Sequence, residues 1–459
     1  MPGTWRKPET AFLRLSGGTR VQASEPVRGR PAKTAGTVTG PERSERTESF
    51  TGETVDIIAE PVDYPFGRPT RLDVAPEYAR CRERPGLTRI HPPYGDDAWL
   101  VTRYHDIRLV LRDRRFVRTP PPGGDEARLT ALPLQDSILN TDPPQQTRLR
   151  RAVASGLRFN AERIDLLRSA AERHSRRLIA ELPDAPPPHD LIDGYVKPLV
   201  VEVLCPLIGI PRQDLAVFLN WFEGFASTAL PADVVEARVE EISRYTDRLI
   251  AARRAEPRDD LVSVLARARV RGEEGDEGAG DGLTEAETKE LVNDVLLAID
   301  NVSTQLSNAS YLLITSPAHL RELRTHPELV PQAVDELLRY APFPSHVTFA
   351  RYATEDVEVG GTLVRAGEQV LPALPAGNHD PSVFDDPDEL DFHRSVNPHL
   401  SFGYGTHHCM GAPLVRMLMR VAISSLAECP PMRLAVPEEE LPWRSDLLIR
   451  RVESLPVTW

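Results

Sequence analysis

The sequence has few cysteines, no long apolar run and no excess of basic residues. Four cysteines at irregular spacing in 459 residues exclude a disulfide framework and are typical of a reducing compartment. No apolar stretch approaches the roughly 20 residues that a membrane-spanning helix needs, and residues 1–7 are not followed by the apolar core of a secretory signal. We therefore expect a cytoplasmic protein without a membrane anchor.

The charge balance is acidic, with a net charge of −13. General nucleic-acid binding requires a basic face, so we expect no nucleic-acid partner. Residues 1–50 differ from the rest because they hold nine basic and five acidic residues. Residues 1–55 are also rich in Gly, Pro, Ser, Thr and Arg without helical or strand periodicity, which predicts a disordered extension. Residues 56–459 are expected to form a single domain.

Helical periodicity dominates the first half of that domain, and short strands come late. The pattern predicts helices over residues 144–157, 161–182, 195–207, 212–227 and 232–255. Thr284 and Glu287 form a capping box that begins a long helix, which runs to about Thr315 and ends before Pro317. Such a helix is roughly 45 Å long and can cross a whole domain. Extended runs at 99–102, 357–360, 370–373 and 447–458 predict small β-sheets in a mainly α fold.

The segment Phe402-Gly-Tyr-Gly-Thr-His-His-Cys-Met-Gly411 presents one cysteine, Cys409, on a glycine-rich loop that leads into a predicted helix. We place the start of that helix at about Cys409, where free N–H groups and the positive end of the helix dipole would lower the pKa of the thiol. Glycines let the backbone turn sharply and lie against a flat ligand; here they are Gly403, Gly405 and Gly411. Phe402 can shield the sulfur from water.

Two plainer interpretations of Cys409 exist. One is a buried, inert cysteine, and the other is half of a zinc site with His407 and His408. A zinc site needs further Cys or His at short spacing, and Cys429 lies too far along a predicted helix.

With its flanking residues, segment 402–411 resembles the cysteine-ligand loop of the cytochrome P450 family, F-G-x-G-x-H-x-C-x-G, at every specified position. The resemblance runs from about residue 60 onward and implies the cytochrome P450 fold, with the long central helix lying over the haem. It implies haem b as the cofactor, with Cys409 as the axial ligand of the iron. Phe402, Gly403 and Gly411 are then cofactor-binding residues.

The resemblance also assigns roles to charged residues elsewhere. Glu336 and Arg339, three residues apart on a predicted helix, resemble the family's buried Glu-Arg-Arg network, with Arg394 as its third member. The haem propionates need cationic or donor side chains. The residues that stand at the family's propionate positions are Arg150, Arg351 and His407. Gln146 occupies a further such position, where the family usually has histidine, and it can donate a hydrogen bond without charge.

The long helix departs from the family pattern Ala-Gly-x-(Asp/Glu)-Thr. Here the sequence is Ala298-Ile-Asp-Asn301, so Asn301 stands where the family has threonine. A shift of one residue aligns Asn301 and Val302 instead, and both registers lack the hydroxyl that helps deliver protons to dioxygen. Asp300 and Asn301 are the candidate catalytic residues because they can hold a water in its place. The alternative is that substrate or solvent supplies the protons. Ala298 is expected at the haem.

Substrate-contacting residues follow from the family's usual stretches. The candidates are Ile299, Phe343, His346, Val347 and Leu448. His346 is the ionisable member and can bind a substrate carbonyl or amine.

The resemblance implies an oxidoreductase that hydroxylates or epoxidises a small natural product with O2. Its electrons would come from a ferredoxin and an NAD(P)H-dependent ferredoxin reductase, steered by cationic side chains such as Arg148, Arg151 and Arg416. A second hypothesis is oxidative C–C or C–N coupling or cyclisation of an aromatic, peptide-like substrate such as a cyclodipeptide or indole, because related enzymes without the threonine include such catalysts. A third, from another class, is a non-catalytic module that recruits a partner.

Overall fold

The computed structural model describes residues 60–67, 70–133, 137–184, 187–214, 221–224, 226–268, 282–344 and 349–459. The chain divides into two units, residues 1–57 and 58–459, and the described residues all belong to the second. The predicted extension over residues 1–55 lies outside them. Within the described residues, no helix is both long and apolar enough to cross a membrane.

The described residues are mainly helical. The helices are α1 (Glu77–Glu83), α2 (Tyr104–Arg112), α3 (Gln145–Leu157), α4 (Ala161–Glu181), α5 (Lys197–Ile208), α7 (Ala232–Ala255), α8 (Leu261–Ala266), α9 (Glu285–Thr315), α10 (Pro317–Thr325), α11 (Val330–Tyr340), α12 (Leu374–Asn378) and α13 (Ala412–Glu428). A π-helical turn at Ile192–Val196 precedes α5. The helix predicted at 212–227 is described only in part, with residues 221–224 helical.

The strands are short and form small sheets. They are β1 (Val62–Asp63), β2 (Thr88–His91), β3 (Ala98–Val101), β4 (Phe116–Val117), β5 (His189–Asp190), β6 (Arg351–Ala353), β7 (Val357–Val359), β8 (Thr362–Val364), β9 (Gln369–Pro372), β10 (Arg433–Leu434), β11 (Trp443–Arg444), β12 (Arg451–Val452) and β13 (Pro456–Thr458). The largest sheet has the order β1-β2-β3-β9-β6-β4. Its β3 and β9 are parallel, with Trp99 opposite Val370, which joins segments 271 residues apart in the sequence.

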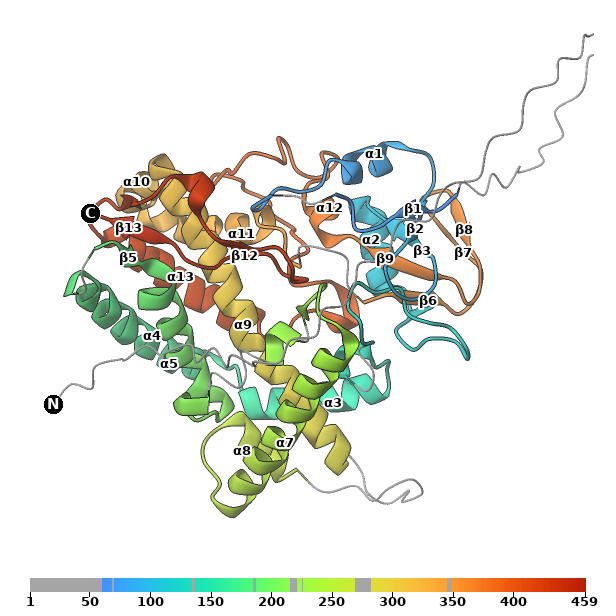
Figure 1. The fold of residues 1–459 in the computed structure, drawn as a ribbon, viewed down its shortest axis with the longest axis horizontal. Helices are drawn as coiled ribbons and strands as arrows, with labels where there is room; N and C mark the ends of the chain where they lie inside the picture. The colour runs from blue at the N-terminus through green and yellow to red at the C-terminus, as the bar shows by residue number, and fades with distance from the viewer. Residues whose placement is uncertain are drawn as a thin grey trace, which may run out of the picture. The chain divides into compact units, whose positions relative to one another are not determined.

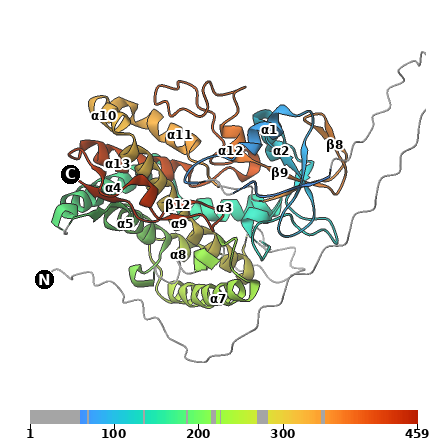
Figure 2. The same cartoon turned by 45° about the horizontal axis from the view of Figure 1, so that its top comes forward.

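Helix α9 crosses the molecule between α4, α5 and α13 on one side and the six-stranded sheet on the other (Figures 1 and 2). Its start follows from the capping box, in which the Glu287 N–H donates to Thr284 Oγ1 (3.0 Å) and the Thr284 N–H donates to Glu287 Oε2 (2.9 Å). No Gly or Pro interrupts residues 285–315, so the helix continues through the interior, and Ser316 and Pro317 end it. The predicted bounds of this helix are confirmed.

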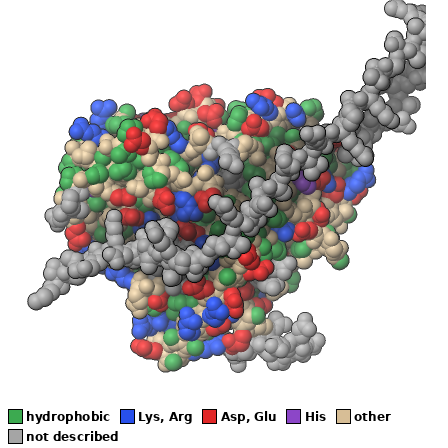
Figure 3. Space-filling model, viewed as in Figure 1, with side chains coloured by type: hydrophobic (Ala, Val, Ile, Leu, Met, Phe, Trp, Pro, Cys, Tyr) green, Lys and Arg blue, Asp and Glu red, His purple; other side chains and the backbone are tan. Residues whose placement is uncertain are grey.

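The outer surface is of mixed charge. Figure 3 shows acidic and basic side chains interspersed on one face, with apolar side chains in small groups between them. The apolar side chains of the interior instead form a large cluster around α5, α9, α11 and α13. This packing holds α9 and α13 in fixed positions, and both carry residues of the candidate site.

Candidate active site

A cavity of about 420 Å³ lies between α9 and the loop that precedes α13. Most residues of α9 that line it recur at spacings of three and four, as one face of a helix does: Leu291, Asp294, Val295, Ala298, Asn301, Val302 and Gln305; Leu297 lines it as well. The opposite wall includes Phe402, Gly403, His407, Cys409 and Gly411. The lining is mostly apolar, so a small, largely apolar molecule can occupy it.

The loop before α13 is held by its own backbone. The Cys409 N–H donates to the Phe402 carbonyl (2.8 Å), and the Gly403 N–H donates to the Leu400 carbonyl (2.7 Å). Gly403 has φ +69°. Gly405 has φ +73°, and a Cβ there would lie 2.4 Å from the Leu111 carbonyl oxygen. Glycine is therefore required at position 405 both by its backbone conformation and by the close approach of α2.

Cys409 is exposed in the structure, and it is one of the residues that line the cavity. Burial raises the pKa of this thiol, while backbone N–H groups of Gly411 and Ala412 and the charge of Arg150 act in the opposite direction. The expected low pKa is thus not produced by the protein groups alone, because burial outweighs them; a metal ion bound to the sulfur would deprotonate it.

Two details of the loop differ from the sequence expectation. The helix begins at Ala412, three residues after Cys409, so the thiol lies just before the helix rather than in its first turn. Gly411 has φ −80°, which any residue adopts, and a Cβ there would make an ordinary 3.7 Å contact with the sulfur of Cys409.

Three arginines and a histidine line the cavity near this loop. Arg351 is 2% exposed and its Nη2 has no hydrogen-bond partner in the described structure. Arg118 is buried against the ring of Phe349, and its Nε and Nη1 also have no partner there. Burial lowers the pKa of Arg118 to about 9. Arg150 donates to the His408 carbonyl (2.8 Å). These cations form a buried positive region.

His407 belongs to the same region. Burial, together with the charges of Arg118 and Arg150, lowers its pKa to about 3. The imidazole is therefore neutral at ordinary pH and can donate one N–H. Arg118 was not identified from the sequence, since an arginine after a short apolar pair gives no signal that distinguishes it from a solvated one.

The two polar candidates on α9 point in different directions. Asn301 lines the cavity, and its Oδ1 is buried without a hydrogen-bond partner in the described structure. Asp300 does not line the cavity; its carboxylate pairs with Arg451 and accepts from Thr304 Oγ1 at 3.4 Å. Burial raises the pKa of Asp300, and Arg451 opposes this shift. The structure thus places Asn301 at the cavity and Asp300 behind it.

The predicted substrate contacts are also divided. Phe343, Leu448 and Ala298 line the cavity. Ile299 is 3% exposed and lies on another face of α9, within the core. His346 and Val347 lie outside the described residues.

Comparison with known proteins decides the family. Residues 210–428 match the family model described as cytochrome P450. The chain is 40% identical over 404 residues to the mycinamicin IV hydroxylase/epoxidase of Micromonospora griseorubida, a match that covers 87% of this chain and 99% of that protein. The chain belongs to the cytochrome P450 family.

Two solved structures of cytochromes P450 extend the comparison. The crystal structure of HinD with NMFT and NO is 49% identical, with a TM-score of 0.82 over 87% of this chain and 100% of that chain. The structure of cytochrome P450mel 107F1, described as having biaryl coupling reactivity, is 37% identical, with a TM-score of 0.76 over 85% of this chain and 97% of that chain. The predicted fold is confirmed.

Haem, ligated through a cysteine thiolate, is the cofactor of the cytochrome P450 family. The residues of this cavity fit it. Cys409 is the cysteine that lines the cavity among the described residues, and Cys81, Cys205 and Cys429 are buried elsewhere. The unpartnered guanidinium atoms of Arg118 and Arg351 match the need of two buried carboxylates for cationic donors.

Gln146 supports this cytochrome P450 loop from outside the cavity. Its Nε2 donates to the Thr406 carbonyl at 2.7 Å, and the side chain is 2% exposed. Phe402 lines the cavity, and the guanidinium of Arg416 lies 4.6 Å from the centre of its ring. Arg416 is held in turn by Asp335 (Nε to Oδ1, 2.6 Å).

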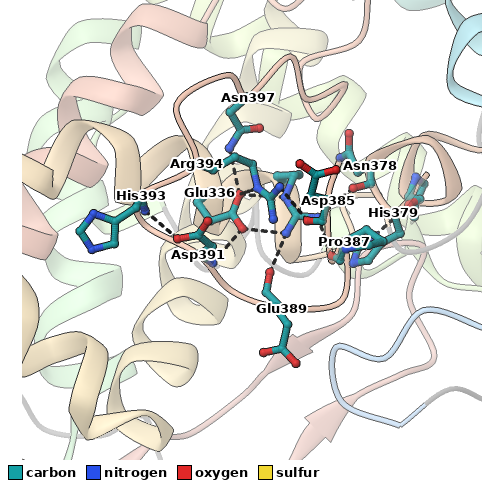
Figure 4. A network of polar contacts seen from close by, with 12 residues as sticks. Glu336, Asn378, His379, Asp385, Pro387, Glu389, Asp391, His393, Arg394 and Asn397 are labelled. Carbon is teal, nitrogen blue, oxygen red and sulfur yellow. Dashed lines mark hydrogen bonds and ion pairs between the residues drawn. The ribbon is translucent and has the colours of Figure 1, made fainter. Parts of the chain in front are cut away.

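The Glu-Arg-Arg network is present and buried. Glu336 and Arg339, both 0% exposed, form two hydrogen bonds of 2.8 and 2.7 Å. Arg394 and Asn397 converge on the same carboxylate at 3.2 and 2.9 Å (Figure 4). Arg339 also donates to the carbonyl groups of Asn378, Pro387 and Glu389. The predicted network is confirmed, and it fixes the segment 378–397 against α11.

Proposed function

We propose that residues 56–459 form one catalytic domain that oxidises a small natural product with O2, using haem ligated by Cys409. The observation that carries this proposal is a mostly apolar cavity lined both by the thiol of Cys409 and by Asn301. Haem supplies the oxidising chemistry when bound. The relative named mycinamicin IV hydroxylase/epoxidase supports insertion of oxygen as the outcome.

The residues of the chain have separate tasks in this proposal. Arg118, Arg150, Arg351 and His407 hold the propionates, and Gln146 keeps the loop in position through Thr406. Asn301 can accept a hydrogen bond at Oδ1 from a water or from the substrate. Asp300 reaches water only if its pair with Arg451 opens, so we propose that it acts as a proton reservoir behind Asn301.

Oxidative coupling is a second candidate. The family's threonine is replaced by Asn301, and a similar structure is described as having biaryl coupling reactivity. The mass of the product decides between the two. Incubation with redox partners, NAD(P)H and ¹⁸O₂ should give a product that carries one labelled oxygen if oxygen is inserted. A product that lacks two hydrogens and carries no label would replace this proposal by coupling.

We propose a ferredoxin, reduced by an NAD(P)H-dependent reductase, as the electron donor. A second depression lies beside the cysteine loop, shares Arg351 and His407 with the cavity, and is also lined by Arg112, Arg114 and Arg151. Its exposed arginines suit an acidic partner. Arg148 and Arg416, expected to steer docking, are instead ion-paired with Glu287 and Asp335. The docking proposal uses the exposed arginines that line the depression, Arg112, Arg114 and Arg151. A cytoplasmic location, supported by the scarcity of cysteine, belongs to the same proposal.

A further inference from the structure

Asp294 is the one acidic side chain among the described residues that line the cavity. It lies on α9, with Leu291 one turn before it and Ala298 one turn after it on the same face. Its surroundings are deep in the protein, and its remaining accessible surface faces the cavity. A carboxylate in an apolar cavity has no role in binding haem propionates, which carry the same charge.

No cation offsets this carboxylate within the described structure. Its Oδ1 accepts from Ser137 Oγ (2.7 Å) and its Oδ2 accepts from the Ile138 N–H (2.9 Å), and both donors are neutral. Burial, with a smaller contribution from the charge of Glu290, raises the pKa of Asp294 to about 7 against the opposing hydrogen bonds from Ser137 and Ile138. Carboxylates in such surroundings are ordinarily paired with a cation, so among the described residues Asp294 lacks its usual cationic partner.

Two cations, one on α3, which packs against α9, and one on α9 itself, have other partners. Arg148 of α3 pairs with Glu287, and Lys289 pairs with Asp247 of α7. Neither cation forms an ion pair with Asp294.

The position of Asp294 on α9 fixes its distance from Asn301 along the helix axis. Asp294 and Asn301 are seven residues apart on one face, which corresponds to about 10.5 Å along the helix axis. A molecule that extends along α9 from Asn301 would bring its far end to the carboxylate.

We propose that Asp294 is a binding site for a cationic nitrogen of the substrate, about 10 Å from Asn301 along the axis of α9. The inference rests on the proposed function, because it names the substrate class of the same cavity. The positive charge of the nitrogen pairs with the negative charge of the carboxylate, which already accepts one hydrogen bond at each oxygen from a neutral donor. The substrate is thus held at both ends, by charge at Asp294 and by the cavity near Asn301.

A purely structural role is the competing explanation. Asp294 caps the short 3-10 turn at Ile138–Asn140, and this contact alone could account for it. Two variants distinguish a structural role of Asp294 from a role in binding the substrate. Asp294→Asn removes the charge and keeps one acceptor oxygen, whereas Ser137→Ala removes a loop hydrogen bond and leaves the carboxylate in place.

The test uses the haem-loaded full chain and phenylalkyl-trimethylammonium ions of increasing alkyl length. A quaternary nitrogen has no lone pair, so it cannot ligate the iron. The matched control for each ion is the neutral compound in which carbon replaces the nitrogen. Dissociation constants come from the spin-state change of the haem spectrum at pH 6 and pH 8.

Wild type should bind the ammonium ion at pH 8 about tenfold more tightly than the neutral compound, or roughly 1.4 kcal/mol. This preference should weaken at pH 6, where the carboxyl is protonated. It should vanish in Asp294→Asn and persist in Ser137→Ala.

Equal affinity of wild type for the two probes, or the same loss in both variants, would overturn the inference. The comparison of probes in wild type stands even if Asp294→Asn does not fold. Failure of the proposed function is distinguishable, because it would appear as an absent thiolate-type spectrum of the reduced carbon monoxide complex.

Discussion

At the scale of single residues, Cys409 differs from the other cysteines because it lines the cavity. Burial raises the pKa of Cys205 and of Cys429 to about 11, and neither lines the cavity. We expect Cys409→Ser to abolish the thiolate-type Soret band of the reduced carbon monoxide complex, because a serine oxygen is not a soft ligand. Cys429→Ser is the matched control, since its Sγ–H donates only to the Ser425 carbonyl (3.1 Å), and it should leave the band unchanged.

An unaltered spectrum in Cys409→Ser would contradict the assignment of the ligand. A wild-type protein without the thiolate band would favour the non-catalytic recruitment module instead.

Arg118 gives a second residue-level prediction, about haem retention. Its Nε and Nη1 lack partners in the described structure, and hydrogen bonds to a propionate would satisfy them. A hydrogen bond to a charged group contributes roughly 1.5–3 kcal/mol, so Arg118→Gln should release haem at least about tenfold faster. Transfer of haem to excess apomyoglobin measures this rate. Arg115→Gln, exposed and paired with Asp113, should release haem at the wild-type rate.

Asp294 also affects stability in a way that depends on pH. Burial raises its pKa to about 7 in the folded state, whereas an unfolded chain gives aspartate about 3.9. Between these values the folded state binds more protons, so the free energy of unfolding decreases as the pH rises from about 4 to about 7. Asp294→Asn removes the carboxyl group that causes this decrease in the free energy of unfolding. The Tm of the variant minus that of wild type, measured without substrate, should therefore be larger at pH 8 than at pH 5.

Ser137→Ala keeps the carboxylate but removes a hydrogen bond that lowers the pKa of Asp294, so it should lower Tm more at pH 8 than at pH 5, opposite in direction to Asp294→Asn. A pH-independent difference for Asp294→Asn would contradict the raised pKa.

At the scale of elements, α11 is tied to the segment 378–397 by the carboxylate of Glu336 and by the guanidinium of Arg339. Removing one partner of a buried ion pair costs about 3–5 kcal/mol, because the other charge remains buried without compensation. Glu336→Ala leaves Arg339, which is 0% exposed, in that situation. We expect little haem-loaded protein from this variant, measured as haem per chain after purification. Arg394→Ala should be milder, since Arg394 forms one longer contact at 3.2 Å.

The matched control is Glu181→Ala on α4. It removes an exposed ion pair with Arg177, so the haem content should equal that of wild type. Equal haem content in Glu336→Ala would contradict a structural role for the network.

The bounds of α9 could be predicted because their causes are local. The capping box at Thr284 and Glu287 starts the helix, and Pro317 follows its end. The cysteine loop could be predicted for the same reason, because the glycines and the histidine that identify it lie within ten residues of each other. The direction of Asp300 could not be predicted, because it depends on Arg451, which lies 151 residues away. The role of Arg118 likewise could not be predicted, because it depends on the cavity that segments distant in the sequence form around this residue.

At the scale of the whole molecule, the net charge of −13 contrasts with the arginines beside the cysteine loop. Because surface charges act on association mainly over a Debye length, docking there should depend strongly on salt. The triple variant with glutamate at Arg112, Arg114 and Arg151 should raise the apparent KM for ferredoxin about tenfold or more at low salt. Steady-state NAD(P)H oxidation at varied ferredoxin concentration measures it.

Arg168→Glu, on the exposed surface of α4, tests whether net charge alone is responsible. It should leave the apparent KM close to that of wild type. An unchanged KM in the triple variant would place the docking surface elsewhere.

The residues that close the cavity come from both ends of the domain, from Leu111 to Ile449. Two hydrogen bonds hold the segment after residue 445 against the rest of the cavity wall. The Leu448 N–H donates to the Ala226 carbonyl (2.8 Å), and Asn308 of α9 donates to the Arg450 carbonyl (3.0 Å). During synthesis on the ribosome, the cavity therefore lacks this wall until residues 448–450 have been made. Enclosure of the cofactor comes after the synthesis of every helix that lines the cavity, however early those helices form.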